Sequence, residues 1–388
     1  MDTKTALRRS ARRASGSRAV SRAVGILERA ARPLPDVLHV LTYHRVDEPE
    51  TSPELYPGLI GATPDEFDEH MRFLASSCRT LSLSDLLAVR RGEAPLPPSA
   101  VLVTFDDGYR SVAERAWPIM RRHGVPLALF VPTAYPGRPG NAFWWDRLWS
   151  ALGIRDGAVS TPLGDLPVRT PEERLHSYRL LRAYVKSLPH EEAMELVDDL
   201  GGDSGDEPRR PSVLDWDDLR RLAAEGVALG PHSRTHPLLH RVTPAEAGEE
   251  VLGSLGDLER EVGPTPRVFA YPGGIDEGVT TLLEEERFEL AFVTRRGVND
   301  LGRPDWLRLR RINVGRSAGL TGIRVQLLSQ WARLQRMRRT KTRVFSHENR
   351  SWTAGAGVLG SAPRTESGGF PPVSTAATYD GKRGQDEG

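Results

Sequence analysis

The sequence predicts an α/β protein in which parallel strands alternate with helices. Short apolar runs of strand character recur along the chain, and amphipathic segments with helical spacing separate them. Repeated units of this length favour a parallel α/β barrel or a doubly wound sheet. The composition agrees with this class, because 38% hydrophobic and 27% charged residues are typical of a globular protein.

The first elements are predicted directly from pattern and capping signals. VLHVLTYHRV at 37–46 has the pattern of a buried strand, and a helix is expected at 64–77. This helix follows Thr63 and begins at Pro64, a combination typical of helix N-termini.

The next elements continue the alternation. Strand 100–105, helix 110–123 and strand 127–132 form an expected βαβ unit, with Gly124 at the helix end. The later elements are expected in this order: helix 215–225, strand 227–230, helix 244–262, strand 267–271, helix 278–286, strand 290–294 and a last strand near 309–314.

Four regions are expected around and within this domain. Residues 1–35 form a basic N-terminal extension, and residues 36–315 form the α/β domain with a helical insertion at about 135–210. Residues 316–344 read as a basic amphipathic helix. From 345 to 388 Gly, Ser, Pro and Thr dominate without periodicity, which predicts a disordered tail.

Composition narrows the partners and the compartment. Cys78 is the only cysteine, which excludes an intrachain disulfide and a thiolate metal cluster. We find neither a bilayer-spanning segment nor the apolar core of a secretory signal, and so expect a cytoplasmic or peripheral membrane protein. No nucleic-acid partner is expected. Residues 1–33 carry nine Lys/Arg against two acidic residues, which suggests contact with a membrane surface or a synthesis complex.

Two short motifs carry the expected chemistry. Asp106 and Asp107 lie at the end of the strand 100–105, and His232 and His236 are four residues apart after the strand 227–230. Adjacent carboxylates repel each other, so a pair at a strand end points to a cation or a catalytic task. Each motif alone has a structural alternative, a turn for DDG and surface histidines for HxxxH. Their occurrence at the strand ends of one α/β chain favours a site.

Two imidazoles and one carboxylate form a catalytic metal shell with an open position. We expect a divalent metal, zinc before nickel, cobalt or iron, because such shells discriminate poorly among these ions. A metal in this shell lowers the pKa of bound water to ~7. The second carboxylate is then a candidate general base.

The motifs TFDDG (104–108), HSRTH (232–236) and FAYPGG (269–274) resemble those of the polysaccharide deacetylases, the NodB-homology or carbohydrate esterase family 4. The resemblance implies a deformed (β/α) barrel and metal-dependent removal of acetyl groups from N-acetylated sugars of the N-acetylglucosamine type. It also implies that Asp106 is the catalytic base. By the same resemblance the metal ligands are Asp107, His232 and His236.

Two departures from the family pattern matter. The last strand, LRRINV at 309–314, has no histidine for the general acid, whereas LTYHRV resembles the circularly permuted poly-N-acetylglucosamine deacetylases, which implies that His44 is the acid. The third motif has Ala270 where many members carry an arginine that orients the base, and Arg267 lies nearby with no assigned role.

The remaining expectations concern substrate contacts. We expect the backbone N–H near Gly273 to stabilise the oxyanion, and Tyr109, Tyr271 and Pro272 to contact the sugar. Two other functions stay open: a metal-dependent hydrolase of a small cyclic amide, and a weakly active carbohydrate-binding partner of an exopolysaccharide synthesis complex.

Overall fold

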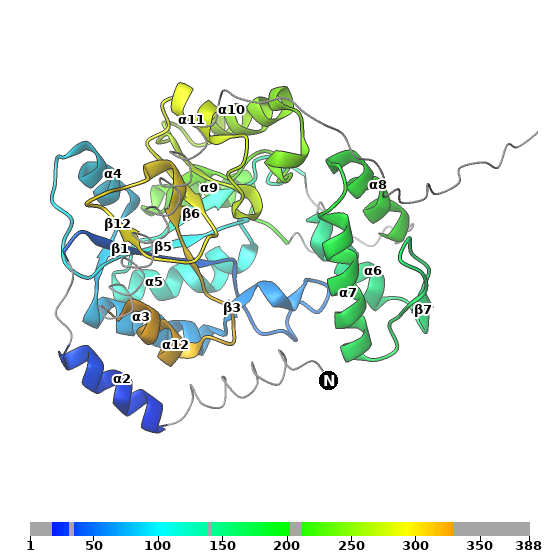
Figure 1. Ribbon diagram of the computed structural model, residues 1–388, viewed down its shortest axis with the longest axis horizontal. Coiled ribbons are helices and arrows are strands. Elements are labelled where there is room, and N and C mark those ends of the chain that lie inside the picture. Colours follow the sequence, from blue (N-terminus) through cyan, green and yellow to red (C-terminus); the bar gives the residue numbers. More distant parts are fainter. Residues whose placement is uncertain (1–17, 31–34, 139–141, 202–211, 329–388) are drawn as a thin grey trace, which may run out of the picture. The chain divides into compact units, whose positions relative to one another are not determined.

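A computed structural model of the chain describes residues 18–30, 35–138, 142–201 and 212–328 (Figure 1). The predicted disordered tail at 345–388 therefore lies outside the described residues. Of the predicted basic helix at 316–344, the described part is α12 (Gly319–Leu327). None of the helices in these ranges is long and apolar enough to cross a membrane.

The main sheet is built from parallel strands that the sequence predicted closely. Its central neighbours, in spatial order, are β1 (Val37–Tyr43), β5 (Ala100–Phe105), β6 (Ala128–Val131) and β9 (Ala228–Pro231). β1 and β5 pair without a break from Leu38–Ala100 to Tyr43–Phe105. Because these two strands end level with each other, the residues that follow them emerge at the same edge.

A second group of parallel strands completes the barrel. It contains β10 (Val268–Ala270), β11 (Leu290–Val293) and β13 (Leu309–Arg310). The last strand is divided: β13 pairs with β11, while β14 (Ile312–Asn313) pairs with β1. Arg311 lies at the division, so the last strand joins the two sheets.

The barrel is irregular on its other side. β9 contacts β10 without a hydrogen-bonded ladder between them in the described chain, and Gly230 of β9 lies close to Val268 of β10. The prediction of a deformed (β/α) barrel is therefore confirmed. Four short strands flank it: β2 (Arg45–Val46), β3 (Ile60–Ala62), β4 (Arg79–Leu81) and β12 (Asn299–Asp300).

Alternation along the strands separates two apolar layers. On β5, Leu102 faces a barrel interior shared with Phe130 and Phe292, whereas Val103 and Phe105 pack in the layer that the surrounding helices cover. This is the period of two that a strand requires. The helices around the barrel are α3 (Pro64–Ser77), α4 (Leu83–Arg91), α5 (Trp117–His123), α9 (Trp216–Ala224), α10 (Pro244–Glu261) and α11 (Thr280–Glu285).

Local sequence explains where these helices begin. The hydroxyl of Thr63 accepts the Glu66 N–H and the Glu66 carboxylate accepts the Thr63 N–H, a capping box at the start of α3. The predicted helix at 110–123 contains a π-helical turn at Val112–Ala116 just before Pro118. Proline has no N–H to donate four residues back, which accounts for the irregular turn.

The region predicted as an insertion forms its own helical layer. It contains α6 (Trp144–Gly153), α7 (Pro171–Val185) and α8 (His190–Gly201). A hairpin of β7 (Ala158–Val159) and β8 (Leu166–Pro167) connects α6 to α7. Figure 1 shows the three helices side by side, and Trp149, Tyr178 and Val197 pack between them.

Part of the predicted N-terminal extension is helical. The helix α2 (Arg18–Ala30) contacts α12, and Arg324 of α12 binds the Glu28 carboxylate with two hydrogen bonds.

Candidate active site

The two adjacent carboxylates are placed by the end of β5. The Asp106 N–H donates to the Tyr43 carbonyl at 3.0 Å, which extends the β1–β5 pairing by one step. The backbone then turns sharply, with φ of 73° at Asp107 and 68° at Gly108. A positive φ is unfavourable for aspartate. The turn nevertheless brings both carboxylates, buried, to one small cavity.

The predicted ligands lie together around one point. The Asp107 Oδ1 atom is 3.7 Å from His232 Nε2 and 3.6 Å from His236 Nε2. One potential ligand atom from each residue lies within 4.8 Å of the other two. The two imidazole rings are nearly perpendicular, at 79°. The structure thus brings together the three residues that the resemblance implied.

A loop with one turn, as the flanking prolines predicted, presents both histidines. His232 follows β9 directly, and its N–H donates to the Val131 carbonyl. Ser233 and His236 have φ values of 63° and 62°, and the Ser233 hydroxyl accepts the His236 N–H at 3.0 Å. The left-handed residues turn the chain so that His236 points back toward His232.

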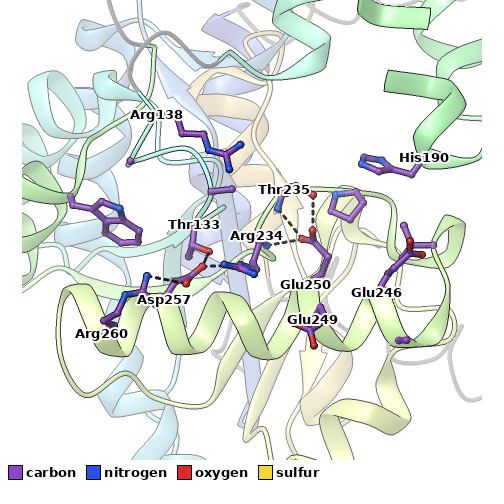
Figure 2. A pocket seen from close by; sticks show the side chains of 16 residues that line it. Thr133, Arg138, His190, Arg234, Thr235, Glu246, Glu249, Glu250, Asp257 and Arg260 are labelled. Carbon is purple, nitrogen blue, oxygen red and sulfur yellow. Dashed lines mark hydrogen bonds and ion pairs between the residues drawn. The ribbon is translucent and has the colours of Figure 1, made fainter. Parts of the chain in front are cut away.

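Helix α10 supports this loop from its other side, along a cavity of about 620 Å³ (Figure 2). Glu250 accepts the backbone N–H groups of Arg234 and Thr235 at 2.7 and 2.8 Å, and the Thr235 hydroxyl at 2.6 Å. Asp257 accepts the Thr133 hydroxyl and the Arg234 Nε–H. Sequence reasoning missed both carboxylates, which hold the loop between the two histidines.

The donor set fits a divalent metal. His232 donates its Nδ1–H to the Ala270 carbonyl at 2.6 Å, which leaves Nε2 available as a ligand atom. Asp107 Oδ1 is buried and has no hydrogen-bond partner among the described residues. Burial, and then the charges of Asp106 and Asp146, raise the pKa of Asp107 well above its ordinary range. A buried carboxylate oxygen that lacks a hydrogen-bond partner and faces two imidazoles is what a cation would stabilise.

The same burial keeps the imidazoles neutral. It lowers the pKa of His232, and it lowers the pKa of His236 further because His232 is nearby. Neutral imidazole is the form that binds metals.

The other carboxylate, Asp106, is fixed by Arg311. The guanidinium donates from both terminal nitrogens to the two Asp106 oxygens, each at 2.7 Å. The Arg311 side chain is 0% exposed and that of Asp106 2%. Burial alone would raise the pKa of Asp106, but Arg311, His232 and His44 hold it at about 2. Asp106 is therefore an ionised, oriented carboxylate, and its Oδ2 lies 4.0 Å from His232 Nε2.

Arg311, which orients the Asp106 carboxylate, is another residue of the candidate site that the sequence did not reveal. The slot examined for an orienting arginine holds Ala270, whose carbonyl orients His232 instead. Arg267 lies away from the site and donates to the Glu286 carbonyl. The available signal was an arginine pair inside the apolar last strand, at the segment noted only for its lack of histidine.

His44 lies at the end of β1 and lines the same cavity as Asp106 and Asp107. Burial lowers the pKa of His44 to about 4; the Asp106 charge acts in the opposite direction, and the Arg311 charge adds to the lowering. The ring is thus neutral in the free protein at neutral pH.

The expected substrate contacts are only partly placed at the cavity. Tyr271 and Gly273 line it, and Gly273 has a φ of 63° in the turn after β10. Pro272 is buried between them. The Tyr271 ring is otherwise packed in the core, and its hydroxyl donates to the Leu307 carbonyl.

The expectation for Tyr109 needs correction. Its side chain is 1% exposed, its hydroxyl donates to Asp146 at 2.6 Å, and it accepts the Trp145 Nε1–H at 2.8 Å. The bridge between Tyr109 and Val213 turns the ring into the core of the insertion. No ring face is therefore available to a sugar, and Tyr109 instead ties the metal-site loop to α6.

Comparison with known proteins agrees with this site. The sequence profile of the polysaccharide deacetylase family matches residues 93–291, just over half of the chain. The matched region contains Asp106, Asp107, His232 and His236, while His44 and Arg311 lie outside it. The chain belongs to the polysaccharide deacetylase family.

Individual relatives are more distant. A 73-residue stretch, 19% of this chain, is 32% identical to the poly-β-1,6-N-acetyl-D-glucosamine N-deacetylase of Escherichia coli K12, and it spans 8% of that protein. The structure of the Streptococcus pyogenes deacetylase PplD in complex with acetate superposes with a TM-score of 0.52 at 16% identity, covering 76% of this chain and 99% of that one. IcaB from Ammonifex degensii has a TM-score of 0.49 at 19% identity, covering 76% and 98%. The similarity to PplD supports the barrel fold.

Proposed function

We propose that this protein is a metal-dependent hydrolase that removes N-acetyl groups from an N-acetylated polysaccharide or oligosaccharide. One observation carries the proposal: the Asp107, His232 and His236 cluster shares a cavity with Asp106, a separate carboxylate that Arg311 fixes. A metal shell with a free, oriented carboxylate beside it is an arrangement suited to hydrolysis by an activated water.

The residues divide the chemistry between them. Asp107, His232 and His236 would hold the metal, for which we propose zinc on the basis of the two imidazoles and one carboxylate. When bound, such an ion polarises the substrate carbonyl and acidifies water. Asp106 accepts the proton of the attacking water, and Arg311 keeps its oxygens aimed at the cavity.

His44 and the turn after β10 complete the reaction. The neutral His44 ring must gain a proton before it can give one to the departing amine. Asp106, which lines the same cavity, passes on to His44 the proton that it took from the attacking water. The Gly273 N–H is the candidate donor to the developing oxyanion. The C–N bond breaks, and the products are acetate and a free amino sugar.

The small size of the cavity supports a substrate that enters it with its acetamide group alone. Its volume is about 80 Å³, far below the roughly 300–1,000 Å³ of pockets that enclose a whole small ligand. Only a small part of a glycan, such as its acetamide group, can enter, while the rest lies across the mouth.

The basic N-terminus gives the protein a further contact. Ile26 and Leu27 are exposed on α2, and residues 1–33 carry nine basic against two acidic residues. We propose that this segment contacts an anionic membrane surface or a polysaccharide synthesis complex.

Acetate release tests the proposed function. Metal-loaded protein is incubated with N-acetylglucosamine oligomers and, separately, with cyclic amides. We expect acetate from the oligomers, and at least about a 100-fold loss in the Asp106→Asn variant, because a general base contributes ~10²–10⁴ in rate. The variant should retain its metal, since Asp106 is not among the expected ligands.

The exposed carboxylate Asp165 provides a matched control, and Asp165→Asn should behave as the parent. His44→Ala should also lower the rate and keep the metal. Turnover of cyclic amides without acetate release from glycans would contradict the proposal. Undiminished activity of Asp106→Asn would remove the assignment of the base.

A further inference from the structure

Two cationic side chains from the insertion line the active-site cavity. Arg182 and Lys186 of the α7 segment are among the residues that form it, beside Asp107 and His236. They are four residues apart, so they lie one turn apart on the same face of the helix. Among the described residues of the insertion, no other brings a positive charge to the lining of this cavity.

Neither cation forms an ion pair with a carboxylate of the described residues. Arg182 lies with Cζ 5.8 Å from the centre of the Tyr56 ring, and its Nε atom is buried without a hydrogen bond. Lys186 forms no ion pair or side-chain hydrogen bond in the described ranges either, and the Asp107 charge attracts it only from beyond ion-pair distance. By contrast, Arg174 of the same helix donates to the Trp149 carbonyl and stacks on its ring, which satisfies it within the protein.

The carboxylates of the cavity do not neutralise the charges of Arg182 and Lys186. Asp106 is matched by Arg311 through two hydrogen bonds. Asp107 faces the two histidines, and a divalent metal held there would compensate it. Arg182 and Lys186 are therefore surplus positive charges that repel each other along the helix. Partly buried charges of one sign are unfavourable unless an anion joins them.

We propose that Arg182 and Lys186 bind an anionic group of the substrate, a carboxylate or a phosphate next to the N-acetylated sugar. This inference rests on the proposed function and narrows its substrate class from N-acetylated glycans in general to acidic ones. Arginine binds such groups through paired N–H donors and lysine through a mobile point charge. The acetamide enters the cavity while its acidic neighbour lies against α7.

Binding and turnover of matched oligosaccharides test the proposal. The probes are a neutral N-acetylglucosamine tetramer, a tetrasaccharide that alternates N-acetylglucosamine with glucuronic acid, and an N-acetylglucosamine tetramer that carries a 6-phosphate. Binding is measured by calorimetry on metal-loaded His44→Gln protein, because this change slows hydrolysis while leaving the cavity charge at neutral pH unaltered. We expect at least tenfold tighter binding of one acidic probe than of the neutral tetramer, with the advantage shrinking as salt is added.

Substitutions in the α7 segment test whether Arg182 and Lys186 cause the preference for acidic probes. Arg182→Gln and Lys186→Gln should each reduce the acidic-to-neutral ratio of kcat/KM, and of affinity, by tenfold or more. The carboxylate and phosphate probes show which anion the pair prefers. Arg179→Gln, an exposed arginine on the same helix, is the matched control and should leave both ratios unchanged.

Several results would overturn this inference. Equal binding of acidic and neutral probes would do so even if acetate is released, and the proposed function would then stand. An equal loss on both substrates in Arg182→Gln and Lys186→Gln would mean that the cations serve the shared acetamide chemistry. Loss of metal from these variants would mean that they belong to the Asp107 site. No acetate from any glycan, with selective anion binding intact, would contradict the proposed function instead.

Discussion

Replacement of Arg311 by methionine should destabilise the protein strongly and at the same time impair Asp106, the proposed general base. Arg311 and Asp106 are both buried and joined by two hydrogen bonds of 2.7 Å. Methionine fills a similar length but leaves a buried carboxylate without its counter-charge. Breaking one side of a buried pair costs about 3–5 kcal/mol of unfolding free energy. The pKa of Asp106 should rise, because burial then acts on it without opposition from Arg311.

A double-mutant cycle separates the pair from general damage. Urea unfolding is measured for the parent, Arg311→Met, Asp106→Asn and the double variant, each with and without a chelator. The double variant should be about 1–3 kcal/mol more stable than the sum of the two single losses predicts, since it removes both charges together. Arg303→Met, an exposed arginine before the last strand, should change stability by no more than about 0.5 kcal/mol.

Additive losses in the cycle would refute the reasoning, as would an Arg311→Met protein as stable as Arg303→Met. Arg311→Lys adds a second check. It keeps the charge but cannot form the paired hydrogen bonds, so it should recover part of the stability while acetate release stays well below that of the parent.

Three further perturbations address the metal loop and the core. His236→Ala should lose bound metal by elemental analysis, and a metal content equal to that of the parent would defeat its assignment as a ligand. Glu250→Ala frees two backbone N–H groups of the same loop and should weaken metal affinity about 10- to 100-fold by chelator competition, whereas exposed Glu249→Ala should not. Burial lowers the pKa of His39 and of His70 from 6.5 to about 4. Below pH 6.5 each histidine therefore takes up a proton more readily in the unfolded chain than in the folded protein. For each of them the free energy of unfolding is unaffected above pH 6.5 and falls by about 3 kcal/mol as the pH drops toward 4. His70→Phe should therefore flatten the acid limb of the unfolding curve, and an unchanged limb would contradict this.

The strand ends and the motifs after them were predictable because both depend on residues that are neighbours in the sequence. Asp106 and Asp107 directly follow an apolar run of strand character, and the prolines around the histidine pair argue against a long helix there. Parallel strands then bring such ends to one edge whatever the details of packing. The same reasoning misjudged Tyr109, because a ring four residues beyond the strand is oriented by Val213, which lies about a hundred residues further along the chain.

Arg182 and Lys186 escaped prediction for a different reason. The apolar positions of α7, such as Tyr178 and Leu181, correctly predicted a helix with one buried face. On that pattern the remaining face is solvent-exposed, and charged residues there require no explanation. Part of the polar face of α7 lines the active-site cavity only because the insertion packs beside the strand ends.

Arg311 shows why the orienting residue was the hardest part of the site to find. It lies 205 residues from Asp106 in the sequence, at the point where the last strand passes from β11 to β1. Its neighbour Ile312 packs in the helix-covered layer and Leu309 in the barrel interior, so nothing in the local alternation distinguishes Arg311 as the partner of Asp106. Because the strand that completes the barrel also carries the counter-charge of the base, loss of Arg311 should affect folding and catalysis together. A variant that repaired stability without restoring the paired hydrogen bonds would separate the two, and its acetate release would report the orienting role alone.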